Sequence, residues 1–194
     1  RLMMKETLGF LPPITGDEIN YPTGFRISAD RSPNLMGMND VCGELEEDFS
    51  SIIKTRDICG LYVLDDGVDR ELDDRWKDIL AKMDFLIVQG YAMTELAKSA
   101  HIVLPGLAPF EREGTITNDK GRIQWLRPSL AAKGNSKPDW EILMLVSNAL
   151  HRKSEHFADL GGVIKKMSDQ FSTYSDISLF KIGTHGMALN GKST

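Results

Sequence analysis

Apolar residues along this chain switch between short continuous runs and helical spacing. The continuous runs predict three strands, at 61–64, 84–90 and 101–106. Apolar positions three or four residues apart predict helices at 70–83 and 92–100, between those strands. Short elements that alternate in this order form a parallel sheet through right-handed crossovers. The pattern therefore predicts an α/β fold, a parallel sheet with flanking helices.

Local signals refine these elements. The run LYVL at 61–64 predicts a strand that is buried on both faces. Thr94 is placed to start the helix at 92–100, and DFSSIIKTRD predicts a helix at 48–57, just before the first strand. The helix at 70–83 has one apolar face, made of Leu72, Trp76, Ile79, Leu80 and Met83.

The C-terminal part of the chain also contains helical patterns. In DWEILMLVSNALHRK, at 139–153, Asp139 is placed to cap or charge the helix start, and Arg152 and Lys153 lie at its end. A further amphipathic helix is predicted at 160–171, whereas HGMALNGKST at 185–194 is too polar and glycine-rich to pack well. The expected apolar face of the first helix is Trp140, Ile142, Leu143, Leu145, Val146, Ala149 and Leu150.

Composition shifts suggest where the domains begin and end. Residues 11–34 are dense in Pro, Gly, Asn and Asp, which break regular structure and favour turns. We expect an irregular connecting segment over 1–34, an α/β domain over 35–155, and a helical C-terminal extension with a flexible tail over 156–194.

The overall charge and the cysteines exclude several classes of protein. A net charge of -5 gives no broad positive field, so general nucleic-acid binding is not expected. Cys42 and Cys59 form neither a CxxC pair nor a disulfide framework, so each is expected to be a small buried residue in a reducing compartment. No apolar run is long enough to span a bilayer, and a cytoplasmic location is expected.

Self-sufficient catalytic or metal chemistry is not indicated. His101, His151, His156 and His185 are scattered, and neither a glycine-rich phosphate motif nor a nucleophile elbow is present. His101 opens a strand and is expected to be structural. No catalytic and no metal-binding residue is therefore predicted.

Ligands of parallel sheets bind beyond the carboxyl ends of the strands. After the first strand, the segment DDGVD contributes Asp65, Asp66 and Asp69, a composition that also suits an ordinary turn. After the second strand, Gln89 offers an amide donor and acceptor, and Gly90 lets a flat group approach the backbone. A polar strand end with a tight turn explains the same residues, and both interpretations stay open.

The segment EREGTITNDKGRIQ, at 111–124, has the same ambiguity. Gly114 and Gly121 bracket a short polar excursion that suggests two turns. It forms either a β-hairpin whose polar residues satisfy their own backbone or a loop that binds a heterocycle or phosphate. The candidate donors and acceptors are Thr115, Thr117, Asn118, Arg122 and Gln124.

The order of these segments resembles the molybdopterin oxidoreductase family. That family shows Val-Gln-Asp at a strand end, Thr-Glu-Thr-Ala, Ala-Asp-Val-Val-Leu-Pro, Gly-Thr-Phe-Thr-Asn-x-Glu-Gly-Arg-x-Gln, and a Pro-x-x-Asp-Trp helix. The matching positions are Gln89, Thr94 to Ala97, Ala100 to Pro105, Glu111, Gly114 to Asn118, Gly121, Arg122, Gln124 and Pro138 to Trp140. Upstream, Asn34, Gly37, Asp40 and Gly43 fall on another family segment. Downstream, YSDISLFKIG at 174–183 resembles the family's Tyr-x-Gly-Ile-Ser-Tyr region, so the resemblance covers roughly 30–187.

The resemblance implies a role for this chain as part of a larger oxidoreductase. The nearest types are formate dehydrogenase alpha subunits and the molybdopterin-family subunit of bacterial NADH:quinone oxidoreductase (NADH dehydrogenase). It implies a Rossmann-like cofactor domain, a C-terminal-half fragment of the catalytic subunit that is not catalytically complete alone. Iron-sulfur clusters are expected only in N-terminal parts of the parent protein, and the expected partners are its other domains and other subunits of an electron-transfer complex. Such a parent is expected to be cytoplasmic and peripheral to a membrane-bound respiratory complex.

Two hypotheses follow from the resemblance. In the first, the chain contributes to a bis-molybdopterin guanine dinucleotide site, with Gln89 and Gly90 near guanine, the DDGVD loop near ribose or phosphate, and Asn118 with Arg122 near the pterin. Thr94 is also expected among the cofactor-binding residues. In the second, the domain has lost the cofactor and acts as a scaffold, as in the NADH:quinone oxidoreductase branch of the family. The family's cofactor-binding members carry Gly-Glu-Asn-Pro where this chain has DDGVD, and an aspartate at the position of Gly90. In the first hypothesis the acids of DDGVD take over the guanine contact.

Overall fold

The computed structural model describes residues 18–24, 26–27, 34–42, 58–69, 71–150 and 155–189. The chain divides into two compact units. We call residues 50–114 and 126–163 the sheet unit, and residues 1–49, 115–125 and 164–194 the hairpin unit. The domain boundaries expected from the sequence stay predictions.

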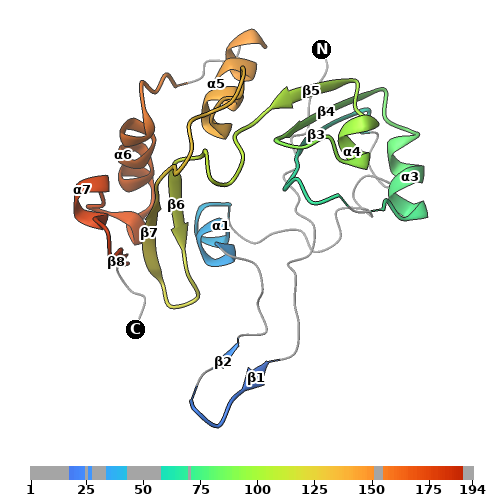
Figure 1. The fold of residues 1–194 in the computed structure, drawn as a ribbon. Helices are drawn as coiled ribbons and strands as arrows, with labels where there is room; N and C mark the ends of the chain where they lie inside the picture. Colours follow the sequence, from blue (N-terminus) through green and yellow to red (C-terminus); the bar gives the residue numbers. More distant parts are fainter. Residues whose placement is uncertain are drawn as a thin grey trace. The chain divides into compact units, whose positions relative to one another are not determined.

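The sheet unit contains a parallel sheet of three strands. These are β3 (Gly60–Leu64), β4 (Phe85–Gly90) and β5 (Ile102–Pro105), in the order β3-β4-β5. The register pairs Leu64 with Gln89 and Gly90 with Pro105, so all three carboxyl ends reach one edge. The connecting helices are α3 (Asp74–Leu80) and α4 (Glu95–Lys98), and α4 contacts β4 (Figure 1). The predicted α/β fold with a parallel sheet is confirmed.

Helix starts in this unit are set by side-chain caps. Thr94 accepts a hydrogen bond from the backbone N–H of Ala97 at 3.1 Å, which confirms its predicted role at the start of α4. Asp73 caps α3 in the same way, through the N–H of Trp76. His101 is structural, as expected, because its Nδ1 accepts from the backbone N–H of Leu86 at 3.0 Å.

Burial differs between the neighbouring strands. In β4, Leu86 and Val88 are almost fully buried. In β3 only Leu61 is buried, and Leu64 is 57% exposed. The expectation that β3 is buried on both faces is therefore wrong, because β3 lies at the edge of the described sheet and has a strand partner on one side only.

Helix α5 (Asp139–Ala149) is shorter and more exposed than its sequence pattern predicts. Pro138 takes the cap position without a side-chain hydrogen bond, so Asp139 is the first helical residue and charges the start of α5 without capping it. Of the expected apolar face only Ile142 is buried, while Leu143 and Leu145 are exposed. Arg152 and Lys153, the predicted helix end, lie outside the described residues, as does the helix predicted at 48–57.

The hairpin unit is built on a three-stranded sheet with the order β6-β7-β8. The strands are β6 (Gly114–Thr117), β7 (Arg122–Leu126) and β8 (Met187–Ala188). β8 pairs antiparallel with β7, and Leu189 after it is buried, so the expectation of a poorly packed tail is wrong at these positions. The remaining elements are β1 (Ile19–Asn20), β2 (Arg26–Ile27), α1 (Leu35–Cys42), α6 (Leu160–Gln170), η1 (Ser172–Tyr174) and α7 (Leu179–Ile182).

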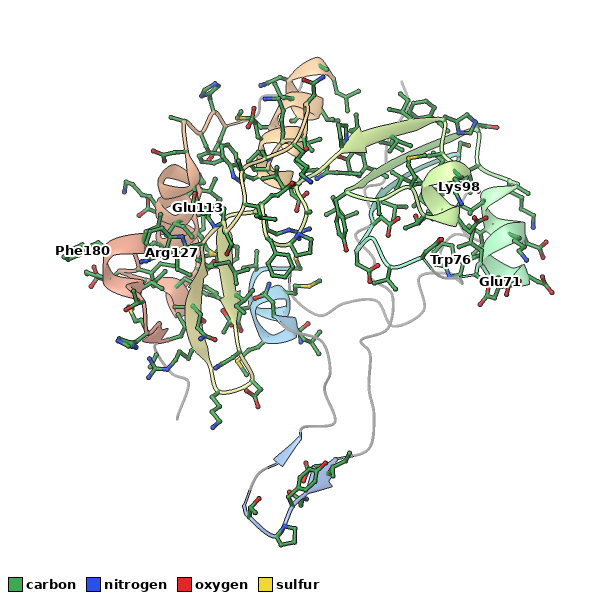
Figure 2. All side chains as sticks on the ribbon, viewed as in Figure 1. Glu71, Trp76, Lys98, Glu113, Arg127 and Phe180 are labelled. Atoms are coloured by element: carbon green, nitrogen blue, oxygen red, sulfur yellow. The ribbon has the colours of Figure 1, made fainter. Side chains whose placement is uncertain are left out.

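Both cysteines and one phenylalanine lie at the surface. Cys42 and Cys59 are exposed, so the expectation that they are buried is wrong. Cys42 closes a short helix and Cys59 precedes an edge strand, positions that place neither side chain in the core. Phe180 is 95% exposed and projects from α7 (Figure 2). Among the described residues, no helix is both long and apolar enough to cross a membrane.

Candidate functional site

The carboxyl edge of the β3-β4-β5 sheet is bound together by carboxylates. Asp65 accepts hydrogen bonds from the backbone N–H of Gly67 and from the hydroxyl of Thr94. Asp69 accepts from the backbone N–H of Glu95 at 2.9 Å, and Asp66 accepts from Val68 at 3.0 Å. The loop after β3 is thereby tied to the loop after β4. The structure brings Asp65, Asp69 and Thr94 together, as their predicted places at strand ends require.

Gln89 is buried beneath this edge and is 1% exposed. Its Oε1 accepts from the hydroxyl of Tyr62, and its Nε2 donates to Oδ1 of Asp139 at 2.7 Å. Both ends of the amide are therefore occupied by protein groups from β3 and α5. Burial, together with the negative charge of Asp139, raises the pKa of Tyr62 to about 12.

Two glycines let the loops at this edge approach each other. A Cβ at position 90 would lie 3.2 Å from the Cβ of Asp65, so that side chain fills the space beside Gly90. Gly67 has a φ of +75°, and a Cβ there would overlap the ring of Tyr91. The ring of Tyr91 thus lies directly on the backbone of the loop at 65–69.

Arg112 reaches the same edge and was not among the site residues predicted from the sequence. Its Nη2 donates to the carbonyl of Leu107 at 3.0 Å, and its guanidinium carbon lies 6.0 Å from the centre of the Tyr91 ring. Its Nη1 is 3.9 Å from Oδ2 of Asp139, too far for a hydrogen bond. Its Nε is buried and has no hydrogen-bond partner in the described structure. An unmet buried donor of this kind costs about 1–3 kcal/mol.

A signal for Arg112 existed in the sequence. It stands next to Glu111 at the start of the segment 111–124, six residues after the predicted third strand ends at 106, where ligand-binding loops begin. Exposed apolar side chains lie on the same loops: Val68 is 50% exposed, Met93 59% and Tyr91 37%. The edge therefore combines a cation, carboxylates and an apolar surface.

The other predicted site residues lie in or beside the hairpin of β6 and β7. Oδ1 of Asn118 accepts from the backbone N–H groups of Lys120 and Arg122, at 3.0 and 2.9 Å. Nη1 of Arg122 donates to the carbonyl of Gly186 at 2.9 Å. Asn118 and Arg122 therefore satisfy backbone groups of the hairpin unit, in keeping with the hairpin interpretation of this segment. Gly114 and Thr115 begin β6, and Gln124 is exposed on β7.

A polar cluster centred on the buried Thr117 and Tyr174 joins three segments distant in sequence. The backbone N–H of Thr117 donates to Oδ1 of Asn34 at 2.8 Å, and Oγ1 of Thr117 lies 3.0 Å from the hydroxyl of Tyr174. That hydroxyl donates to Oδ2 of Asp40 at 3.2 Å. Burial raises the pKa of Tyr174. A Cβ at Gly37 would overlap Oδ1 of Asn34, so α1 packs here only without a side chain at that position.

Comparison with known families decides what these residues belong to. Residues 20–149 match the sequence pattern of the family described as molybdopterin oxidoreductase. The chain belongs to the molybdopterin oxidoreductase family. Family membership implies a molybdopterin cofactor in the full-length protein.

Curated relatives of this chain include proteins named as formate dehydrogenases. A Staphylococcus haemolyticus protein that carries this name provisionally is 38% identical over 100 residues, 50% of this chain and 10% of its own length. The alpha subunit of a formate dehydrogenase from Methanococcus maripaludis is 30% identical over 109 residues, 56% of this chain and 16% of its own. A Bacillus subtilis oxidoreductase is 42% identical over 89 residues, 45% of this chain and 9% of its own. The chain therefore matches about a tenth to a sixth of the length of these relatives.

The sheet-unit edge combines groups that can bind the parts of a nucleotide. The guanidinium of Arg112 has an unmet donor, which suits a phosphate oxygen. Asp69 is exposed and uses one carboxylate oxygen for the N–H of Glu95, so a carboxylate is available at the edge for the N–H groups of a purine. Tyr91 and Met93 offer exposed apolar surface to a flat ring. Within the described residues there is no cluster of His, Cys, Asp or Glu that could hold a metal ion.

Proposed function

We propose that this chain is part of a molybdopterin-dependent oxidoreductase of the formate dehydrogenase type, and that its sheet unit contributes to binding bis-molybdopterin guanine dinucleotide. The observation that carries the proposal is the carboxyl edge of β3, β4 and β5. There hydrogen bonds tie the loop at 65–69 to Thr94 and Glu95, and Arg112 lies against the ring of Tyr91. When bound, the cofactor would supply the redox chemistry, and the residues of this chain would position it.

The proposed roles follow from which groups are already occupied. Asp69, with Asp66 on the same exposed loop, is the candidate for guanine and ribose. One oxygen of Asp69 accepts from Glu95, whereas both oxygens of Asp65 are held by Gly67 and Thr94. Gln89 would not touch the cofactor itself, because its hydrogen bond holds Asp139 in place. Gly90 lets the end of β4 lie close to Asp65. Asn118 and Arg122, with Gly114, Thr115 and Gln124 beside them, shape a hairpin that we assign to the wall of the pterin site. The expected partners are the other domains of the parent protein, including those that hold iron-sulfur clusters, and other subunits of an electron-transfer complex.

A scaffold function is the second candidate, and one observation favours it. Both amide atoms of Gln89, and both carboxylate oxygens of Asp65, are occupied inside the protein. Residues that hold the fold together in this way need no cofactor. In this alternative the domain resembles the molybdopterin-family subunit of NADH:quinone oxidoreductase and supports the assembly of a multisubunit complex.

Cofactor analysis of the full-length protein separates the two functions. The protein would be purified under anaerobic conditions, denatured, and assayed for pterin fluorescence, GMP released by acid hydrolysis, and molybdenum or tungsten. The proposal expects pterin and GMP in equal amounts, together with one of the two metals. Full-length protein that assembles with its partners and contains neither pterin nor GMP would establish the scaffold function instead.

A further inference from the structure

The unmet hydrogen-bonding capacity of Arg112 is the feature of the sheet unit that its own residues leave unexplained. The side chain is 35% exposed as a whole, while its Nε is buried. The carbonyl of Leu107 and the ring of Tyr91 hold it in place. A cation fixed in this way loses little conformational freedom when it binds an anion.

Asp139 forms a long ion pair with Arg112 but no hydrogen bond. Oδ1 of Asp139 is bound by Nε2 of Gln89 at 2.7 Å, and Gln89 is itself fixed by Tyr62. Because Asp139 is also the first residue of α5, its backbone cannot move toward Arg112 without moving the helix. Oδ2 therefore remains 3.9 Å from Nη1.

The guanidinium offers one edge to an external anion. Nη1 is the nitrogen nearest to Asp139, so the edge formed by Nε and Nη2 is the one turned away from that carboxylate. Nε has no partner and Nη2 has one. A planar fork of two N–H groups matches two oxygens of a phosphate. The carboxylates of the loop at 65–69 would repel an anion. Part of that repulsion is offset because each carboxylate accepts a hydrogen bond from a backbone N–H group.

We propose that Arg112 binds a phosphate group of a nucleotide at the carboxyl edge of the β3-β4-β5 sheet. Nε and Nη2 donate to two phosphate oxygens, which requires a local rearrangement that exposes the buried Nε. The attached base and sugar extend over the exposed surface of Val68 and Met93. This inference rests on the proposed function, since it names the residue that would hold a phosphate of the dinucleotide.

The test compares GMP with guanosine, because the two ligands differ only in the phosphate. The full-length protein would be prepared from a host that makes no pterin, and binding of each ligand would be measured by calorimetry. We expect GMP to bind on the order of tenfold or more tightly than guanosine, and R112Q to remove that difference while guanosine binding stays unchanged. R112K should recover part of the difference in affinity between GMP and guanosine, since lysine keeps the positive charge but lacks the planar pair of N–H donors.

The control is R127Q, which removes the same charge from another exposed arginine of the sheet unit (Figure 2). It should bind GMP as the unaltered protein does. R112Q that binds GMP normally would overturn the assignment of Arg112 and leave the proposed function standing. R112Q that loses GMP and guanosine equally would show a structural role and overturn the assignment as well. If the unaltered protein binds neither GMP nor guanosine, both the assignment of Arg112 and the proposed function are overturned.

Discussion

The two units use similar polar residues for different purposes. In the hairpin unit, Thr117 and Tyr174 are buried, and hydrogen bonds join them to the half-buried Asn34 and Asp40. In the sheet unit, the network that runs from Tyr62 through Gln89 to Asp139 ends beside Arg112, whose donors are not all used. The first arrangement is complete without a ligand, whereas the second has capacity left for one. Residues of one family motif can therefore differ in role: some hold the protein together, and others contact a ligand.

The largest effect is expected at the centre of the hairpin-unit cluster. In G37A the new methyl group displaces Oδ1 of Asn34, which leaves the buried N–H of Thr117 without its acceptor. That loss costs about 1–3 kcal/mol and outweighs the gain of up to about 1 kcal/mol from alanine in a helix. Hydrogen exchange followed by mass spectrometry should show faster exchange over 115–125 and no change over 60–105.

Gly114 gives a matched control, because a Cβ there would meet nothing within 4 Å. G114A should leave exchange in both units unchanged. If G37A and G114A behave alike, the polar cluster does not hold the hairpin unit together.

A smaller effect is expected from Q89L in the sheet unit. Leucine keeps the buried volume but leaves the hydroxyl of Tyr62 and the carboxylate of Asp139 without their shared partner, at a cost of about 1–2 kcal/mol. Exchange should rise over 60–105 and stay constant over 115–125, the reverse of G37A. Q124L makes the same chemical change at an exposed position and should have almost no effect. Equal effects of Q89L and Q124L would contradict a structural role for Gln89.

The smallest effect is expected from Y62F, and it depends on pH. The pKa of Tyr62 is raised from about 10 in the unfolded chain to about 12 in the folded one. The unfolded state therefore loses its proton first, and the stability that Tyr62 contributes is complete below about pH 10 and disappears between about pH 10 and 12. Urea unfolding followed from about pH 8 to 11 should show a shallower loss of stability in Y62F. An identical pH slope in both proteins would show that Tyr62 does not titrate as described.

Local patterns in the sequence were sufficient for most of the sheet unit. The three strands and the cap at Thr94 depend on neighbours within a few residues, which hydrophobic runs and capping preferences report directly. The places of Asp65 and Asp69 followed from the rule for strand ends in parallel sheets. The hairpin of β6 and β7 was one of two interpretations, and the backbone hydrogen bonds at its turn, from Asn118 to Arg122 and from Gly121 to Asn118, support it.

Features that depend on distant partners could not be predicted in the same way. For Gln89 a ligand-binding amide and a structural strand end both stayed open, because its partners, Tyr62 and Asp139, lie 27 and 50 positions away. The tail was expected to pack poorly, since nothing local in Met187 and Ala188 reveals that they pair with β7. The apolar face of α5 was predicted from spacing alone, but spacing does not say how much of such a face the rest of a unit covers.

The most direct test of the central claim is the nucleotide content of the full-length protein carrying G67A or G134A. Both glycines have positive φ, at +75° and +58°, so both substitutions strain the backbone. Only at Gly67 would the new methyl group overlap Tyr91 and disturb the edge beside Arg112, because a Cβ at Gly134 meets nothing within 4 Å. If the sheet-unit edge holds the nucleotide, GMP and pterin per protein should fall on the order of tenfold in G67A and remain unchanged in G134A. Equal GMP content in the two variants would contradict the claim.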